Sequence, residues 1–406
     1  MAFRPYTREP ITLPGRATLP GVSLALVGHL GAGKTTLLVA LTQALADRGW
    51  APRADFHSLD VTPYERERGI SISLSHVRAR SERRRHVWID CPGHLDFLRN
   101  AYNGIAQADQ GVLVVAADQG LMPQSREHVR LAAHLGVSDW VVYISKLDVG
   151  VSEELLELSE LEIREFFNSL ELEGDGLTIL RGAPRAALES RMKRHTDSLW
   201  ALVDAVDALP LPRRDVDAPL LMPVADSFSR YQPRSVIVTG KLSRGALALG
   251  ESIELLGYDQ RWRGVVTSLH RERAPAERVS AGDHASVLLE GRTVWNTRRG
   301  QVIAAPESVR PRDELRVELH MVSASEGGYG HPVFAGFFRP QLHVHTADVT
   351  TRILAERGLE RDVVFRPGES VRALLELQYP LVTRASQPIV LRASRKLVAL
   401  GTILNP

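Results

Sequence analysis

Glycine, lysine and hydroxyl residues gather near the start of the chain in a pattern that suits phosphate binding. Residues 28–36 are G-H-L-G-A-G-K-T-T and follow an apolar run at residues 22–27. Glycines let the backbone turn its N–H groups around phosphate oxygens, Lys34 adds charge for the β- and γ-phosphates, and the Thr35 hydroxyl can ligate Mg²⁺. A strand before this loop and a helix beginning near Lys34 are the expected context. The sequence therefore predicts a nucleotide-phosphate site at Gly28, His29, Leu30, Gly31, Ala32, Gly33, Lys34, Thr35 and Thr36.

A second group of chemically able residues follows the apolar stretch Val87-Trp88-Ile89. It is Asp90-Cys91-Pro92-Gly93-His94. An aspartate at the end of a strand beside a phosphate loop can hold Mg²⁺ through water, and Gly93 lets a backbone N–H approach a γ-phosphate. His94 would lie where a water attacks that phosphate. A histidine after a glycine is often only a loop residue, but beside these motifs the catalytic interpretation is favoured.

The base of the nucleotide is indicated by Ser145-Lys146-Leu147-Asp148, at the end of the apolar run 141–144. Asp148 can accept from the N1–H and N2–H₂ of guanine together, a pairing that adenine does not offer. Lys146 can lie across the plane of the base. Residues 68–72 provide a weaker signal, in which Ser71 offers a hydroxyl for the metal, as a switch segment requires. We expect GTP or GDP as the ligand.

These motifs must be positioned by a larger framework. Residues 1–20 contain four prolines and are interpreted as an extended arm, and residues 21–212 alternate short apolar runs with helical stretches such as 125–135 and 152–170. This alternation predicts a mostly parallel sheet with helices on both faces. A doubled proline at 210 and 212 indicates a linker.

The remaining chain has a different texture, with short alternating segments such as 235–239, 252–256 and 285–289 separated by turn residues. This pattern predicts two all-β barrels, at residues 213–308 and 309–406. The run Arg83-Arg84-Arg85 lies between two strand candidates and is interpreted as a solvated hairpin tip.

Composition limits the class of protein. The 406 residues are 44% hydrophobic and 24% charged with a net charge of +2, and Cys91 is the only cysteine. These values are typical of a soluble globular protein without disulfides or cysteine metal sites. We expect no signal peptide, no membrane span and a cytoplasmic location.

Taken together, the motifs resemble the bacterial elongation factor Tu family of translational GTPases. The likeness includes Asp90-Cys91-Pro92-Gly93-His94 and Gln124-Ser125-Arg126-Glu127-His128, and it continues to Phe338-Arg339-Pro340-Gln341 and Asp348-Val349-Thr350. The resemblance implies a P-loop GTPase domain followed by two barrels, and a monomer that hydrolyses GTP and delivers aminoacyl-tRNA to the ribosome. It further implies an exchange factor of the elongation factor Ts type.

The resemblance also assigns roles to individual residues. His94 matches the histidine that positions the hydrolytic water, and Leu30 and Ile70 match the apolar gate beside it. The magnesium environment is matched by Thr35, Asp60, Ser71 and Asp90.

The chain departs from the family at ligand positions. Gly31 and Ala32 replace an aspartate and a histidine, and Ser145 replaces an asparagine. The family segment S-A-L aligns with Ala183-Pro184-Arg185, and Pro184 has no N–H to give to guanine O6. Two lost donors would weaken GTP binding about tenfold to a hundredfold, or relax the choice of base.

Further departures lie in the β-rich half. Ser394 and Arg395 replace two glycines on the tRNA-facing side, and Asp283-His284 replace Glu-Asn near the aminoacyl pocket. The leading hypothesis is an aminoacyl-tRNA carrier. The alternative is a divergent paralogue with a regulatory or specialised tRNA-binding role and weakened or slow GTP hydrolysis. A third possibility, the GTPase subunit of a sulfate-activating complex, is disfavoured by the segments at 326–328 and 348–350.

Overall fold

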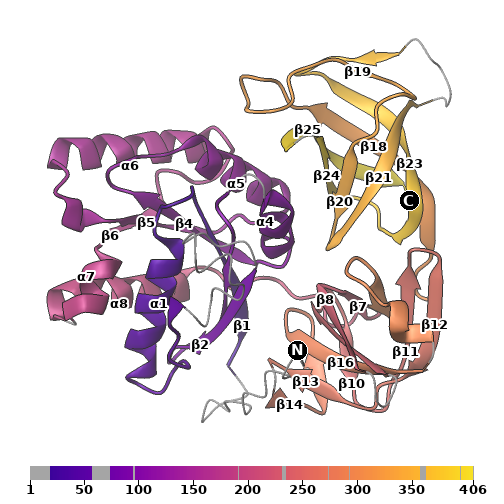
Figure 1. The fold of residues 1–406 in the computed structure, drawn as a ribbon, viewed down its shortest axis with the longest axis horizontal. Helices are drawn as coiled ribbons and strands as arrows, with labels where there is room; N and C mark the ends of the chain where they lie inside the picture. The colour runs from indigo at the N-terminus through magenta and orange to yellow at the C-terminus, as the bar shows by residue number, and fades with distance from the viewer. Residues whose placement is uncertain are drawn as a thin grey trace, which may run out of the picture.

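The computed structural model describes residues 19–56, 74–94, 97–190, 192–230, 235–272, 274–291, 293–356, 363–393 and 395–405. It has an α/β part, which lies to the left in Figure 1, and two β-rich parts to the right. The expected fold class is confirmed: a mostly parallel sheet with helices on both faces is followed by β-rich domains, of which the last is a closed barrel. Within the described residues, no helix combines the length and apolar character needed to cross a bilayer.

The α/β part is built on a sheet of six strands in the order β2-β3-β1-β4-β5-β6. The neighbours are parallel except for β2, which pairs antiparallel with β3. Its elements are β1 (Gly21–Val27), α1 (Lys34–Ala46), β2 (Ser75–Arg80), β3 (Arg85–Asp90), α4 (Leu98–Ile105), β4 (Gln110–Ala116), α5 (Pro123–His134), β5 (Trp140–Ser145), α6 (Glu153–Asn168), β6 (Thr178–Arg181), α7 (Pro184–Ser190) and α8 (Lys193–Ala208).

Both faces of this sheet are buried, which explains the continuous apolar runs of its strands. Successive side chains of a strand point to opposite faces. In β1, Ala25 and Val27 pack with residues of α4, α5 and α6, whereas Leu24 and Leu26 pack with residues of α1, α7 and α8. Polar side chains therefore gather where the strands end, and the carboxyl ends of β1, β3 and β5 meet at one edge.

The hairpin between β2 and β3 corrects one expectation from the sequence. The turn is present and Arg83 is exposed as expected, but Arg84 and Arg85 are not part of a solvated tip. Arg84 is buried, and its guanidinium donates to the carbonyls of Val206 and Leu209. Arg85 begins β3 and pairs with the carboxylates of Glu272 and Asp283, which belong to the first of the two β-rich parts, called the middle domain below. The side chains of Arg84 and Arg85 are therefore both bound by partners that are distant in sequence.

The middle part is composed of short antiparallel strands around one apolar core. Its sheets have the orders β12-β11-β17-β7, β14-β13-β16-β9-β8 and β10-β15. The strands are β7 (Leu221–Pro223), β8 (Asp226–Arg230), β9 (Ser235–Lys241), β10 (Ala246–Ala248), β11 (Ser252–Gly257), β12 (Gln260–Val265), β13 (Leu269–Arg271), β14 (Ala274–Pro275), β15 (Arg278–Ser280), β16 (His284–Glu290) and β17 (Val302–Ala304).

The last part is a closed barrel with the ring order β18-β23-β21-β20-β24-β25, and a small sheet of β19 and β22 lies beside it. The strands are β18 (Pro311–Met321), β19 (Val333–Phe334), β20 (Gln341–Val344), β21 (Ala347–Ala355), β22 (Val364–Phe365), β23 (Ser370–Val382), β24 (Pro388–Ala393) and β25 (Lys396–Asn405). Closure of the barrel pairs the edge strands with each other, and the side chains that point inward form an apolar core of their own.

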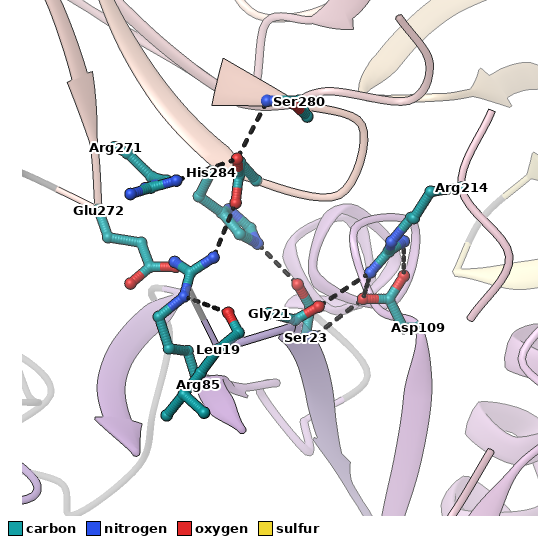
Figure 2. A network of polar contacts seen from close by, with 11 residues as sticks. Leu19, Gly21, Ser23, Arg85, Asp109, Arg214, Arg271, Glu272, Ser280 and His284 are labelled. Atoms are coloured by element: carbon teal, nitrogen blue, oxygen red, sulfur yellow. Dashed lines mark hydrogen bonds and ion pairs between the residues drawn. The ribbon is translucent and has the colours of Figure 1, made fainter. Parts of the chain in front are cut away.

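Polar contacts join the α/β part to the middle domain at the edge of the sheet opposite the predicted nucleotide site. Figure 2 shows Arg85 beside Glu272, and Ser23 between His284 and the Asp109–Arg214 pair. The Ser23 hydroxyl and His284 Nε2 are 2.9 Å apart, and Arg85 Nη1 is 2.6 Å from a Glu272 oxygen. The middle domain therefore contacts the amino-terminal ends of β1 and β3, and it does not cover their carboxyl ends.

Candidate nucleotide-binding site

A cavity of about 410 Å³ lies at the carboxyl ends of β1, β3 and β5. It brings together most of the residues that the motifs single out. The lining residues predicted from the sequence are Leu30, Gly31, Gly33, Lys34, Thr35, Thr36, Gly93, Ser145, Lys146, Asp148 and Pro184. Gly28, His29, Ala32, Asp90, His94 and Ala183 do not line it, although several of them contact residues that do. Asp60, Ile70 and Ser71 lie outside the described residues.

The loop between β1 and α1 has a backbone that only glycine adopts easily. Gly33 has a φ of 89°, in the left-handed region, and Gly28 has a φ of 149°. A Cβ at Gly28 would lie 2.3 Å from the carbonyl oxygen of Val114 in β4. The glycines of the motif are therefore required by close backbone approach as well as by chain direction.

Lys34 begins α1 and turns back over the loop. Its ammonium donates to the carbonyls of Gly28 and His29, at 3.0 and 2.9 Å. Burial lowers the pKa of this ammonium, and the nearby Asp90 carboxylate opposes that shift. A buried cation held mainly by neutral carbonyls favours the approach of an anion such as a phosphate.

Hydroxyl and carboxylate oxygens meet beside this cation. The Thr35 hydroxyl donates to an Asp90 carboxylate oxygen over 2.7 Å, and Asp90 is buried at the end of β3. Hard oxygen ligands of this kind suit Mg²⁺, which commonly takes one or two protein oxygens together with phosphate oxygens and water. The described part of the proposed magnesium set therefore fits that ion.

Gly93 passes directly over the lysine. A Cβ at this position would lie 2.5 Å from Lys34 Nζ and 2.8 Å from the Leu30 amide nitrogen. Only a residue without a side chain fits here, so the Gly93 backbone is held close to the phosphate loop. The next residue, His94, has its ring 5.6 Å from that of Phe97, between centroids.

The far end of the cavity holds the predicted base-binding residues. Lys146 has a φ of 62°, and its ammonium is 3.4 Å from an Asp118 carboxylate oxygen. The Asp148 carboxylate belongs to an exposed turn, Leu147–Val149, that follows β5. The Ser145 hydroxyl donates over 2.6 Å to the carbonyl of Ala32. Serine therefore ties β5 to the phosphate loop despite its short reach.

Sequence reasoning missed three lining residues: Phe56, Val149 and Arg185. Val149 and Arg185 each follow a predicted residue directly, so extending the two motifs by one position would have included them. Phe56 comes from the segment after α1 and belongs to no motif. Pro184 is the first residue of α7, which places Arg185 at the mouth of the cavity.

Helix α5 supports the phosphate loop from behind. The His29 amide donates to the Ser125 hydroxyl over 3.0 Å, and the Leu30 amide lies 3.4 Å from Gln124 Oε1. At the other end of α5, His134 Nε2 lies 3.0 Å from the Ile389 carbonyl oxygen of the barrel. One helix therefore contacts the phosphate loop with its first turn and the barrel with its last.

Helix α4, which follows the His94 loop, also contacts the barrel. Arg99 pairs with Asp348 over 2.6 Å, and the Tyr102 ring lies 4.9 Å from that of His343, between centroids. Helix α4, which follows the Gly93 segment, and helix α5, which contacts the phosphate loop, thus both contact the same barrel.

Two departures from the resembled family fall elsewhere in the described structure. Asp283 and His284 lie where the middle domain contacts the α/β part, with Asp283 Oδ1 3.1 Å from Arg85 Nη2. Arg395 has a φ of 73°, the left-handed backbone that glycine adopts most easily. Ser394 lies outside the described residues.

Comparison with protein families accounts for most of the chain. The model of the elongation factor Tu GTP binding domain matches residues 20–227, that of elongation factor Tu domain 2 matches residues 235–304, and that of the elongation factor Tu C-terminal domain matches residues 308–405. The three models follow one another in chain order, and the first alone covers half of the chain.

Among solved structures, the chain is similar to a bacterial selenocysteine-specific elongation factor, EF-Sec, with a TM-score of 0.74 and 21% sequence identity. The match covers 95% of this chain and 58% of that structure. At this identity the likeness concerns the fold, and the chain spans little more than half the length of that relative.

Proposed function

The chain belongs to the elongation factor Tu family of translational GTPases, and from that premise we propose that it is a GTP-dependent carrier that delivers aminoacyl-tRNA to the ribosome. The observation that carries the proposal is the cavity at the sheet edge. It has a buried lysine at the phosphate end and the Ser145–Asp148 motif at the base end, and two helices run from it to a β domain. In GTPases, contacts to the γ-phosphate order switch segments that are released on hydrolysis, and a link of this kind would couple the nucleotide to a distant surface.

We assign the predicted residues to parts of GTP. The loop from Gly28 to Thr36 binds the phosphates, and Lys146 and Asp148 bind the base, with Ser145 supporting the loop. Bound Mg²⁺, held by Thr35 and Asp90 together with Asp60 and Ser71, would neutralise charge on the β- and γ-phosphates. Leu30 and Ile70 would form the apolar gate beside the γ-phosphate. Ala183 and Pro184 would border the base.

Hydrolysis then requires a water in line with the γ-phosphate. His94 would orient that water through a hydrogen bond, and the Gly93 amide would donate to the γ-phosphate. The water oxygen bonds to phosphorus, the bond from phosphorus to the β-γ bridging oxygen breaks, and GDP and phosphate leave. Loss of the γ-phosphate contact at Gly93 would release the loop that precedes α4, and α4 would alter its contacts with the barrel.

The remaining features of the proposal follow from the delivery role. We propose action as a monomer in the cytoplasm, with the ribosome as partner and an exchange factor of the elongation factor Ts type replacing GDP. The proposed domains are residues 21–212, 213–308 and 309–406, after an arm at 1–20. The break between α8 and β7 and that between β17 and β18 support these limits. The comparisons do not favour the regulatory alternative.

The test is protection of the aminoacyl ester. Purified protein is loaded with a non-hydrolysable GTP analogue or with GDP, and spontaneous hydrolysis of a panel of aminoacyl-tRNAs is timed. We include selenocysteyl-tRNA because the similar solved structure is described as selenocysteine-specific. We expect protection of at least one aminoacyl-tRNA in the analogue-bound form and little in the GDP form. Equal ester lifetimes with and without protein, across the panel, would refute the carrier role while leaving GTP hydrolysis to be measured separately.

A further inference from the structure

We propose that the Arg185 side chain recognises guanine by donating hydrogen bonds to O6 and N7 of the base. The inference rests on the proposed function only in taking a guanine nucleotide as the ligand. It makes Arg185 a specificity-determining residue of the same cavity, opposite Asp148.

Guanine presents two kinds of atoms on adjacent parts of its edge. N1–H and N2–H₂ are donors and suit the Asp148 carboxylate, whereas O6 and N7 are acceptors and need a donor. Adenine has an amino group in place of O6, so a donor aimed at that position would reject it. A donor beside the Asp148 position would therefore add to the discrimination that Asp148 provides.

Several backbone positions around the base end have no N–H to give to a base. Pro184 lines the cavity and has no N–H. The Val149 amide donates to the Lys146 carbonyl over 3.2 Å, and the Leu147 amide donates to the Gly182 carbonyl over 3.3 Å. The amide of Gly182 itself donates to the Ile144 carbonyl over 2.9 Å. These bonds hold the turn after β5 and the approach to α7 in place, so their donors are not free for the base.

Two cationic side chains line the same end of the cavity in the described structure, Lys146 and Arg185. The Lys146 ammonium lies 3.4 Å from an Asp118 carboxylate oxygen, and we expect this side chain to lie against the plane of the base. Among the described residues, Arg185 Nε pairs with Glu189 in its own helix, over 3.1 Å, and the two side chains are 78% and 66% exposed. An exposed pair of this type contributes little, so the guanidinium can exchange Glu189 for a base at small cost.

The shape of the guanidinium matches the acceptors. Its N–H groups form a planar fork, and bidentate donation to O6 and N7 is the commonest specific contact that proteins make to guanine in the major groove of DNA. Asp148 and Arg185 would then read the donor half and the acceptor half of one base. The lost amide at Pro184 is compensated by the next residue along the chain.

The experiment measures dissociation constants of the full-length protein for GDP, 7-deaza-GDP and ADP. The 7-deaza base lacks N7 as an acceptor and keeps N1–H, N2–H₂ and O6, so it removes one half of the proposed contact. We expect the wild type to bind GDP more tightly than 7-deaza-GDP. We expect Arg185→Ala to weaken GDP binding about tenfold to a hundredfold and to remove most of that preference.

Three further variants separate the contact from a simple charge effect. Arg185→Lys keeps the charge without the fork and should recover only part of the affinity. Glu189→Gln frees the guanidinium and should leave GDP binding unchanged or tighter by a few fold. Pro184→Ala restores an N–H, so in the Arg185→Ala background it should recover affinity for GDP but not the preference over 7-deaza-GDP.

The outcomes separate this inference from the proposed function. If wild type binds GDP no better than ADP, the guanine nucleotide itself is wrong and the function fails first. If wild type selects GDP but Arg185→Ala binds it equally well, the role of Arg185 is overturned and the function stands. Equal weakening of GDP, 7-deaza-GDP and ADP by Arg185→Ala would also overturn it, because the side chain would then act on the phosphates. Thermal melts of each variant verify that it is folded.

Discussion

The ammonium of Lys241, in the middle domain, lies 2.5 Å from a carboxylate oxygen of Asp109 in the α/β part. Arg214, in the segment that joins these two parts, donates to both oxygens of the same carboxylate, at 2.6 and 2.7 Å. The Ser23 amide of β1 adds a fourth bond, over 2.9 Å. One buried carboxylate therefore connects β1, the connecting segment and the middle domain, as Figure 2 shows for Ser23, Asp109 and Arg214.

Removing this charge should loosen the junction. Burial alone raises the pKa of the Asp109 carboxyl, but Lys241 and Arg214 outweigh it and hold that pKa well below its usual value. Asp109→Asn would leave two cations packed together without a counter-charge. We expect a loss of about 3–5 kcal/mol in the free energy of unfolding, measured by urea denaturation at neutral pH.

The matched control for that variant is Asp47→Asn. Asp47 pairs with Arg53 at the surface, where each side chain is 49% exposed. Such pairs contribute about 0–1 kcal/mol, so this variant should unfold nearly as the wild type does. Similar losses in both variants would show that burial does not determine the strength of the Asp109 cluster.

A side chain at position 93 should disrupt the phosphate site. Gly93→Ala would place a Cβ 2.5 Å from Lys34 Nζ and 2.9 Å from the carbonyl carbon of His29. Either the ammonium or the loop must move, so we expect GTP binding to weaken by about tenfold or more in a fluorescent-nucleotide titration. Gly176→Ala is the control, because the nearest atom to its Cβ is 3.9 Å away. Unchanged GTP affinity in Gly93→Ala would contradict the close approach of residue 93 to the loop.

His94 should affect hydrolysis and not binding. Because the ring does not line the cavity, His94→Ala should retain GTP and GDP affinity. Single-turnover hydrolysis should slow by about 10²–10⁴-fold if the imidazole orients the attacking water. His195→Ala, in helix α8, should hydrolyse GTP at the wild-type rate because His195 does not line the cavity. A wild-type rate in His94→Ala would remove the histidine from the mechanism.

Acidification should weaken the barrel and its contact with α4 through His343. Burial, aided by Arg392, Arg99 and Arg299, lowers the pKa of this imidazole to about 3, and its ring faces Tyr102. The pKa in the unfolded chain is about 6.5, so between these values the unfolded state binds the extra proton. The stability that the neutral ring contributes is complete above pH 6.5 and is lost as the pH falls toward 3.

The measurable quantity is the difference between wild type and His343→Gln in the free energy of unfolding. On lowering the pH from 5.5 to 4.5, wild type should lose up to about 1.4 kcal/mol more than the variant, because glutamine does not titrate. Parallel losses in the two proteins over this range would mean that His343 binds a proton in the folded state as readily as in the unfolded one.

Much of the nucleotide site was predictable because its determinants are local. The loop at 28–36 needs glycines for its own backbone, and Lys34 and Thr35 lie at fixed steps from them. The carboxyl ends of parallel strands share one edge, so Asp90 and the residues after β5 were expected beside that loop. Arg185 lies one position beyond the predicted Ala183 and Pro184 and was left out, whereas Phe56 was not found because no local pattern marks a side chain that enters a cavity from another segment.

The sequence by itself indicated the ligand class, the α/β-then-β order of the chain and the residues that we predict to meet a phosphate, since these follow from short-range periodicity and motif spacing. Only the tertiary structure decided what the arginines and histidines do. A run of arginines between two strands is typical of a solvated turn. In the structure, however, Arg84 is buried against α8 and Arg85 is paired with the middle domain. A charged side chain is stabilised by whichever carboxylate or carbonyl the fold brings near it. Those partners lie more than a hundred residues away, where periodicity carries no information.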